Sequence, residues 1–183
     1  MPPDIKDILY SAIDKIGKEK IRMEVISKIE SSEECCNQIL EKCKSKLGCD
    51  MDDKAFGNLC EALLHFMLTA SVLPSERKLK WKGAQLDIVV PSLRMLNKNP
   101  AKALIIQVIK RDAELIKIKQ AESVQPCYGN IWIVSPTHLK VHHKKHHKNY
   151  YVGSRYFPYS RIISDINAFL VGEGVRGLKL LDG

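Results

Sequence analysis

The run ALIIQVIK (103–110) constrains the fold of this chain more than any other segment, because it is apolar at nearly every position. A strand with apolar side chains on both faces belongs in the centre of a sheet that is covered on both sides. Another strand-like run, QLDIVVP (85–91), precedes it, and NIWIVSP (130–136) follows a helix-like segment at 112–124. This order of elements predicts an α/β domain whose sheet is covered by helices.

The remaining elements are predicted from apolar spacing and turn residues. ERKLKW (76–81) and the run at 85–91 flank a KGA turn, which indicates a β-hairpin. The first 50 residues carry three apolar stripes at helical spacing and therefore predict three helices. Two more helices are expected at 55–71, where Asp52 or Asp53 is the N-cap, and at 161–170.

The charge of the chain is unevenly distributed. The formal net charge is +8, but residues 1–54 carry 12 acidic and 10 basic side chains, whereas residues 55–183 carry 9 and 19. A basic half indicates a polyanionic partner, and we predict nucleic acid, DNA rather than RNA. A charge excess that serves only solubility is the alternative. The acidic N-terminal helices are expected to form a cap, or a surface for a protein partner or homodimer, rather than a helix-turn-helix on DNA.

The sequence predicts a cytoplasmic protein without membrane association. No apolar run approaches the ~20 residues that a membrane span needs, and MPPDIKDILYSAIDK at the start lacks the apolar stretch of a signal peptide. None of the six cysteines forms a CxxC pair. We therefore expect reduced thiols that pack as small hydrophobic residues, not a zinc site.

Asp87 lies early in one predicted strand, and Lys110 ends the next. Over residues 54–136 the order is helix, strand, strand with Asp, strand ending in Lys, helix, strand. This order resembles the PD-(D/E)XK nuclease superfamily, whose restriction-endonuclease-like fold includes archaeal Holliday-junction resolvases. The resemblance implies a restriction-endonuclease-like mixed sheet flanked by helices at 53–183, with a helical N-terminal extension at 1–52.

The resemblance also implies a site for phosphodiester hydrolysis. In that family the Asp and an acidic residue of the next strand hold Mg²⁺, and the Lys positions the attacking water. The resemblance assigns Asp87, with Glu61 on the preceding helix, to Mg²⁺ or Mn²⁺, and it assigns Lys110 to the water. The acidic strand position falls on Val108, so the motif is degenerate.

Three arrangements of this site remain open. In the first, Glu61 supplies the second carboxylate. In the second, Gln107 replaces the missing ligand through a β-bulge, since strand alternation otherwise points it away from Val108 and Lys110. In the third, catalysis is lost, and the chain is a nuclease-like binding module or a protein-interaction subunit of a larger nucleic-acid-processing complex.

Cationic side chains of the hairpin and of segment 138–161, with a glutamine of the helix at 112–124, are predicted to contact nucleic acid. They are Arg77, Lys78, Lys80, Lys82, Gln120, Lys144, Lys145, Lys148 and Arg155. Segment 138–161 has no acidic residue and interleaves cations with tyrosines, which suits phosphate contacts and base stacking. A solvated loop and a metal site of histidines spaced by four, such as His142 and His146, are the alternatives.

Overall fold

A computed structural model describes residues 4–47, 52–135, 146–152 and 158–174. In these residues one sheet has the strand order β1-β2-β3-β4-β5. β1, β2 and β3 are antiparallel, whereas β3, β4 and β5 are parallel. The predicted mixed α/β sheet and the hairpin are thereby confirmed. The strands are β1 (Glu76–Trp81), β2 (Ala84–Val90), β3 (Leu104–Val108), β4 (Ile131–Ser135) and β5 (Lys148–Tyr151).

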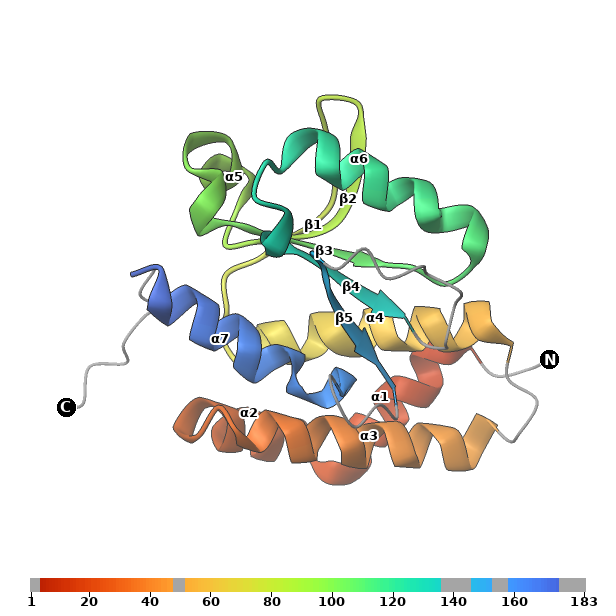
Figure 1. The fold of residues 1–183 in the computed structure, drawn as a ribbon. Helices are drawn as coiled ribbons and strands as arrows, with labels where there is room; N and C mark the ends of the chain where they lie inside the picture. The colour runs from red at the N-terminus through yellow and green to blue at the C-terminus, as the bar shows by residue number, and fades with distance from the viewer. Residues whose placement is uncertain (1–3, 48–51, 136–145, 153–157, 175–183) are drawn as a thin grey trace.

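Helices cover both faces of the sheet (Figure 1). One face carries α5 (Leu93–Lys98) and α6 (Ile116–Val124), and a 3₁₀ turn at Asp112–Leu115 precedes α6. The other face carries α4 (Asp53–Ala70) and α7 (Ile162–Gly172). Beneath them lies a layer of N-terminal helices: α1 (Ile5–Ile16), α2 (Lys18–Ser27) and α3 (Ser31–Leu47). Shorter 3₁₀ turns lie at Pro100–Lys102, Tyr128–Asn130 and Tyr159–Arg161.

The main hydrophobic core lies between the sheet and the helices of the α4 side. It joins Ile13 of α1 and Cys43 of α3 with Leu63 of α4 and Val108 of β3. The core is therefore continuous across residue 52, and a division into parts 1–52 and 53–183 stays a prediction. A smaller cluster, including Val89, packs on the other face under α5 and α6.

α4 begins where its sequence predicts. Asp52 is its N-cap, and the Asp52 carboxylate accepts a hydrogen bond of 2.5 Å from the backbone N–H of Ala55. The helix then buries an apolar stripe that includes Leu59, Leu63 and Met67. Cys60 lies among these residues as a free thiol, and burial raises its pKa to about 12. Cys35, Cys36 and Cys43 are also buried free thiols.

The histidine-rich segment contains an element that the sequence analysis missed, because β5 pairs in parallel with β4. Tyr150 of β5 and Tyr159 are core side chains with exposed fractions of 0% and 1%. Their hydroxyls donate to Asp165 Oδ2 at 2.7 Å and to the Cys60 carbonyl at 2.6 Å. These two rings are therefore not available to stack on bases, and the contact of segment 138–161 with nucleic acid stays a prediction. α5 was likewise not predicted.

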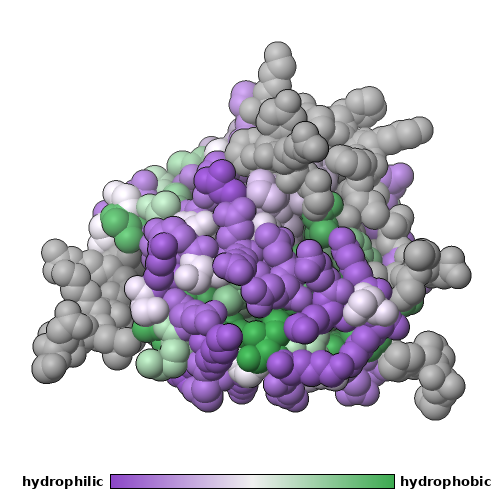
Figure 2. All heavy atoms as spheres, turned by 90° about the horizontal axis from the view of Figure 1, so that it is seen from below, coloured by the Kyte–Doolittle hydropathy of each residue, from purple (hydrophilic) through white to green (hydrophobic). Residues whose placement is uncertain are grey.

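The N-terminal helices form the face that Figure 2 shows. Hydrophilic side chains cover most of this face and surround a smaller hydrophobic area. The use of these helices as a surface for a protein partner or a homodimer stays a prediction. No helix in the described part of the chain is long and apolar enough to cross a membrane.

Candidate active site

Side chains hold β2 and β3 together beyond the end of their backbone ladder, which pairs Ile88–Val90 with Leu104–Ile106. The Val108 N–H donates to Asp87 Oδ2 at 2.9 Å. The Gln107 carboxamide accepts from the Asp87 N–H at 3.1 Å and donates to the Gln85 carbonyl at 2.8 Å. Because a carboxamide has a donor and an acceptor, Gln107 replaces a backbone peptide group at this point.

The ammonium group of Lys117 lies between two carboxylates. Its Nζ is 3.1 Å from Asp87 Oδ2 and 3.3 Å from Glu114 Oε2, and it donates to the Val108 carbonyl at 3.4 Å. The Lys117 side chain is only 18% exposed. Burial acts to lower the pKa of Lys117, but the charges and hydrogen bonds of Asp87 and Glu114 raise it above its ordinary value. This structure therefore holds a cation among two carboxylates and a backbone carbonyl.

Lys110 lies against α4 and forms a second cluster. Its Nζ donates to Asn58 Oδ1 and to Glu61 Oε2, both at 2.6 Å. Lys78 Nζ lies 3.8 Å from Glu61 Oε1. Burial acts to raise the pKa of Glu61, but Lys110, with smaller contributions from Lys78 and Lys117, lowers it below its usual value. The carboxylate is thus ionised and holds Lys110 in place.

Glu114 connects the two clusters. The backbone N–H of Lys110 donates to Glu114 Oε2 at 3.3 Å, and the same oxygen contacts Lys117. The result is a connected series of residues, Glu61, Lys110, Glu114, Lys117 and Asp87, in which the link between Lys110 and Glu114 is the Lys110 backbone N–H; we call this series the charge line. Lys117 lies between two carboxylates that would otherwise repel one another, and Lys110 pairs with Glu61.

The site residues predicted from the sequence all lie near the end of β3, but not in the predicted arrangement. Asp87 and Glu61 bind different lysines, so their sharing of a metal ion stays a prediction. Gln107 is fully buried and turns toward Asp87 without a bulge, because the register of β3 with β4 is unbroken from Ile105 to Val108. The catalytic roles of Lys110 and Gln107 likewise stay predictions.

Sequence reasoning missed Glu114 and Lys117. A search for an acid two residues before Lys110 looks only at the strand, whereas Glu114 follows Lys110 in the 3₁₀ turn that leads to α6. The available signal was the spacing of three between Glu114 and Lys117, which brings the side chains of a helical segment together.

The other predicted contacts to nucleic acid lie in several places. Arg77, Lys78, Lys80 and Lys82 are exposed on β1 and its turn. Gln120 accepts a hydrogen bond of 3.3 Å from the Gln85 N–H, so its amide oxygen has a structural partner. Lys148 is exposed, and its Nζ lies 4.8 Å from the centroid of the Trp132 ring. Lys144, Lys145 and Arg155 lie outside the described residues.

The described histidines of the basic segment do not form a metal cluster. His147 is buried, with Nε2 at 3.0 Å from Glu122 Oε1 and Nδ1 at 3.0 Å from the Tyr128 carbonyl. His146 is exposed, and His142 lies outside the described residues. In the described part of the chain, no group of three or more His, Cys, Asp and Glu side chains is arranged to hold a metal ion.

Comparisons with known proteins were made for sequence and for structure. No protein-family model matches the chain, and no curated protein matches it. One similar solved structure is the restriction endonuclease PspGI in complex with substrate DNA, with a TM-score of 0.54, 15% identity, and coverage of 93% of this chain and 94% of that chain. Another is metal-depleted Ecl18kI in complex with uncleaved, modified DNA, with a TM-score of 0.55, 9% identity, and coverage of 98% and 82%.

The fold is restriction-endonuclease-like. Because the matches cover nearly the whole chain, the matched region includes most of the N-terminal helices. The likeness to Holliday-junction resolvases and the degenerate motif stay predictions.

The exchange Gln107→Glu tests the peptide-like role of Gln107. We expect a loss of about 1–3 kcal/mol in the free energy of unfolding, because a carboxylate at the fully buried position 107 cannot donate to the Gln85 carbonyl. Urea denaturation measures the loss. Gln120→Glu is the control, since Gln120 only accepts from Gln85, and we expect it to change stability by no more than about 0.5 kcal/mol. Equal stability of Gln107→Glu and wild type would contradict the role.

The exchange Gly57→Ala tests the packing of Lys110 on α4. A Cβ atom at Gly57 would lie 2.5 Å from Lys110 Cγ, so the Lys110 side chain must shift from the position in which it pairs with Glu61. Alanine normally stabilises a helix by about 1 kcal/mol relative to glycine. We nevertheless expect a lower melting temperature for Gly57→Ala, and no loss for Gly172→Ala, where nothing lies within 4 Å.

A double-mutant cycle separates the contact with Lys110 from a general effect of the new methyl group. In a Lys110→Ala background, Gly57→Ala should lose most of its destabilising effect, because the clashing Cγ atom at 2.5 Å is gone and only the Cβ atom at 3.0 Å remains. If Gly57→Ala stabilises the wild type as much as Gly172→Ala does, Lys110 is not fixed against α4.

Proposed function

We propose that the protein binds nucleic acid and hydrolyses phosphodiester bonds with a divalent metal ion, and that Glu114 supplies the second carboxylate of a rearranged site. One observation carries the proposal: the Lys117 ammonium is held between Asp87 and Glu114, beside the Val108 carbonyl. A position that is surrounded by two carboxylates and a carbonyl favours a cation.

The chemistry of these donors suits Mg²⁺ or Mn²⁺. Mg²⁺ binds to proteins through one or two carboxylates and keeps several waters or phosphate oxygens in its coordination shell. Asp87, Glu114 and the Val108 carbonyl would hold the ion once the Lys117 side chain moves aside. A bound ion neutralises charge on the phosphate and lowers the pKa of a bound water.

Lys110 contributes positive charge from a fixed position. An ammonium group has three donors, and Asn58 and Glu61 accept two of those of Lys110. The described residues provide no third acceptor for Lys110 Nζ, so this donor is available to a phosphate oxygen or to the attacking water. A preorganised donor of this kind stabilises negative charge as it develops in the transition state.

The surroundings of the site agree with a nucleic-acid substrate. The exposed cations Arg77, Lys80 and Lys82 on the β1–β2 hairpin suit contacts to the phosphate backbone. Both similar solved structures are DNA complexes, and the Ecl18kI complex is metal-depleted and holds uncleaved DNA. These two complexes support DNA as the substrate and a metal ion as the cofactor.

Removal of either carboxylate tests the metal site. We expect Asp87→Asn and Glu114→Gln each to abolish the rise in melting temperature that Mg²⁺ or Mn²⁺ produces in the wild type, because a bound ion stabilises the folded state by mass action. Cleavage of labelled DNA should be lost in the same variants. Glu41→Gln, an exposed change on α3, should keep both responses.

Two results would correct this proposal. If Glu61→Gln abolishes the metal response and Glu114→Gln does not, the ion lies between Asp87 and Glu61. If the wild type shows no metal response and no cleavage but binds DNA in a salt-dependent manner, the protein is a nuclease-like binding module.

The exchange Lys117→Met tests whether the ammonium and the metal ion compete for one position. In EDTA we expect a lower melting temperature than for the wild type, because Asp87 and Glu114 lose the cation between them. The rise on addition of Mg²⁺ should be larger than in the wild type. Lys119→Met, an exposed change on the same helix, should leave that rise unchanged. A smaller rise for Lys117→Met would contradict competition.

A further inference from the structure

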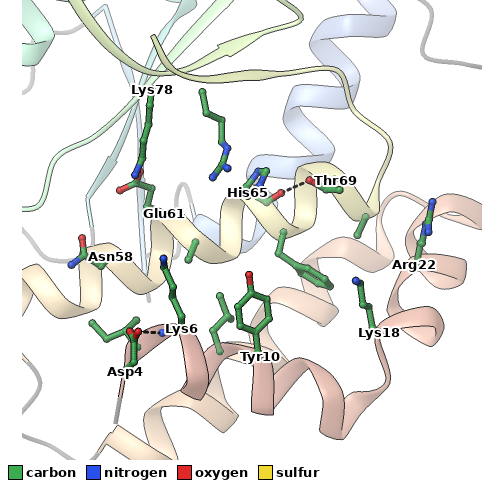
Figure 3. A pocket seen from close by; sticks show the side chains of 16 residues that line it. Asp4, Lys6, Tyr10, Lys18, Arg22, Asn58, Glu61, His65, Thr69 and Lys78 are labelled. Atoms are coloured by element: carbon green, nitrogen blue, oxygen red, sulfur yellow. Dashed lines mark hydrogen bonds and ion pairs between the residues drawn. The ribbon is translucent and has the colours of Figure 1, made fainter. Parts of the chain in front are cut away.

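A cavity of about 640 Å³ opens beside the charge line. α1 and α2 form one wall, and α4 with β1 forms the other (Figure 3). Asn58, Glu61 and Lys78 line its end nearest to Lys110, so the cavity and the candidate active site share a wall. We call this cavity the α1–α4 groove.

The α1–α4 groove is strongly cationic. Its basic side chains are Lys6, Lys18, Arg22, Arg77 and Lys78, whereas its acidic side chains are Asp4 and Glu61. Both acids have partners, because Asp4 accepts a hydrogen bond from the backbone N–H of Lys6 and Glu61 binds Lys110. Except for Lys78, none of these cations forms an ion pair with a carboxylate of the described residues. The groove therefore has unneutralised positive charge for an anionic ligand.

Ring side chains accompany these cations. Tyr10 is 58% exposed, and Figure 3 shows its hydroxyl pointing from α1 toward α4. His65 and Phe66 of α4 also line the groove. The pKa of His65 is lowered, mainly by burial and further by Arg77, so its imidazole is neutral at pH 7. Exposed rings next to cations provide surfaces on which bases stack.

We propose that the α1–α4 groove binds an unpaired strand of nucleic acid and leads it to the charge line, so that the preferred substrate contains a single-stranded segment. This inference rests on the proposed function and specifies its substrate class. Duplex DNA is read by convex elements that enter its grooves, whereas single strands lie in cationic hollows with stacking rings. The volume of the α1–α4 groove falls in the range of roughly 300–1,000 Å³ that is usual for clefts that bind small ligands. The groove can therefore hold only part of a strand.

Fluorescence anisotropy in EDTA measures binding without cleavage. The probes are a labelled oligothymidylate of about 12 nucleotides and a labelled blunt duplex. We expect the double variant Lys18→Gln, Arg22→Gln to weaken binding of the oligothymidylate and to reduce its logarithmic salt slope by about 1.4, the value for two lost phosphate contacts on a single strand. The matched control is Lys28→Gln, Lys42→Gln, which removes the same charge from exposed positions outside the groove.

Tyr10 tests the stacking part of the inference. Tyr10→Ala should weaken binding of the oligothymidylate roughly tenfold, whereas Tyr10→Phe, which keeps the ring, should bind as the wild type does. Tyr128→Ala, at an exposed tyrosine outside the groove, should have no effect. Wild-type affinity in both Tyr10→Ala and the Lys18, Arg22 double variant would overturn the inference, as would an equal loss for the blunt duplex.

Asp87→Asn separates this inference from the proposed function. If Asp87→Asn abolishes cleavage while the groove variants bind the oligothymidylate as the wild type does, the groove inference fails and the proposed function stands. If the groove variants lose binding while Asp87→Asn cleaves normally, the groove inference stands and the proposed metal site fails.

Discussion

The candidate site depends on the point where the backbone pairing of β2 with β3 ends, beyond Ile88 and Ile106. Where the backbone ladder ends, Asp87 accepts from the Val108 N–H, and the Gln107 carboxamide bridges to β2. Without these bonds, the backbone N–H of the buried Val108 would lack a partner, at a cost of about 1–3 kcal/mol, and the Asp87 N–H and Gln85 carbonyl would lose theirs. With these bonds in place the Asp87 carboxylate faces α6, and Lys117 contacts both of its oxygens, Oδ1 at 3.3 Å and Oδ2 at 3.1 Å. The Asp87 side chain therefore both connects β2 to β3 where their backbone pairing ends and places a negative charge next to Lys117.

The charge line explains how several partly buried ions are tolerated together. Each carboxylate in it contacts a lysine, and the lysines Lys110 and Lys117 each contact an acid from another element. Loss of one member leaves its neighbour buried without compensation, which is costly. The fold must therefore bring β2, the turn after β3, and α4 to one point. A site of this kind is stable with its own lysines in place, and the proposed metal ion would have to displace Lys117.

The fold could be predicted from the sequence because strands and helices depend on the local spacing of apolar residues. The hairpin, the apolar β3 and the stripe of α4 follow from it, and they also bring Asp87 and Lys110 to the end of one strand. The arrangement beyond that point depends on side-chain contacts between distant segments, which periodicity does not contain. Glu114 was missed because a 3₁₀ turn separates β3 from α6, and β5 was missed because histidines and lysines flank its buried tyrosines.

α4 links the candidate site to the α1–α4 groove. Asn58 and Glu61 on one part of the helix hold Lys110, and His65, one turn further along, lines the groove. Figure 3 shows these side chains along one side of the helix. Because the opposite side of α4 is packed in the core, the helix cannot rotate without exposing Leu63 and Met67. A strand that lies in the groove would therefore meet Lys110 at a fixed distance, which is the condition for cleavage at a defined position.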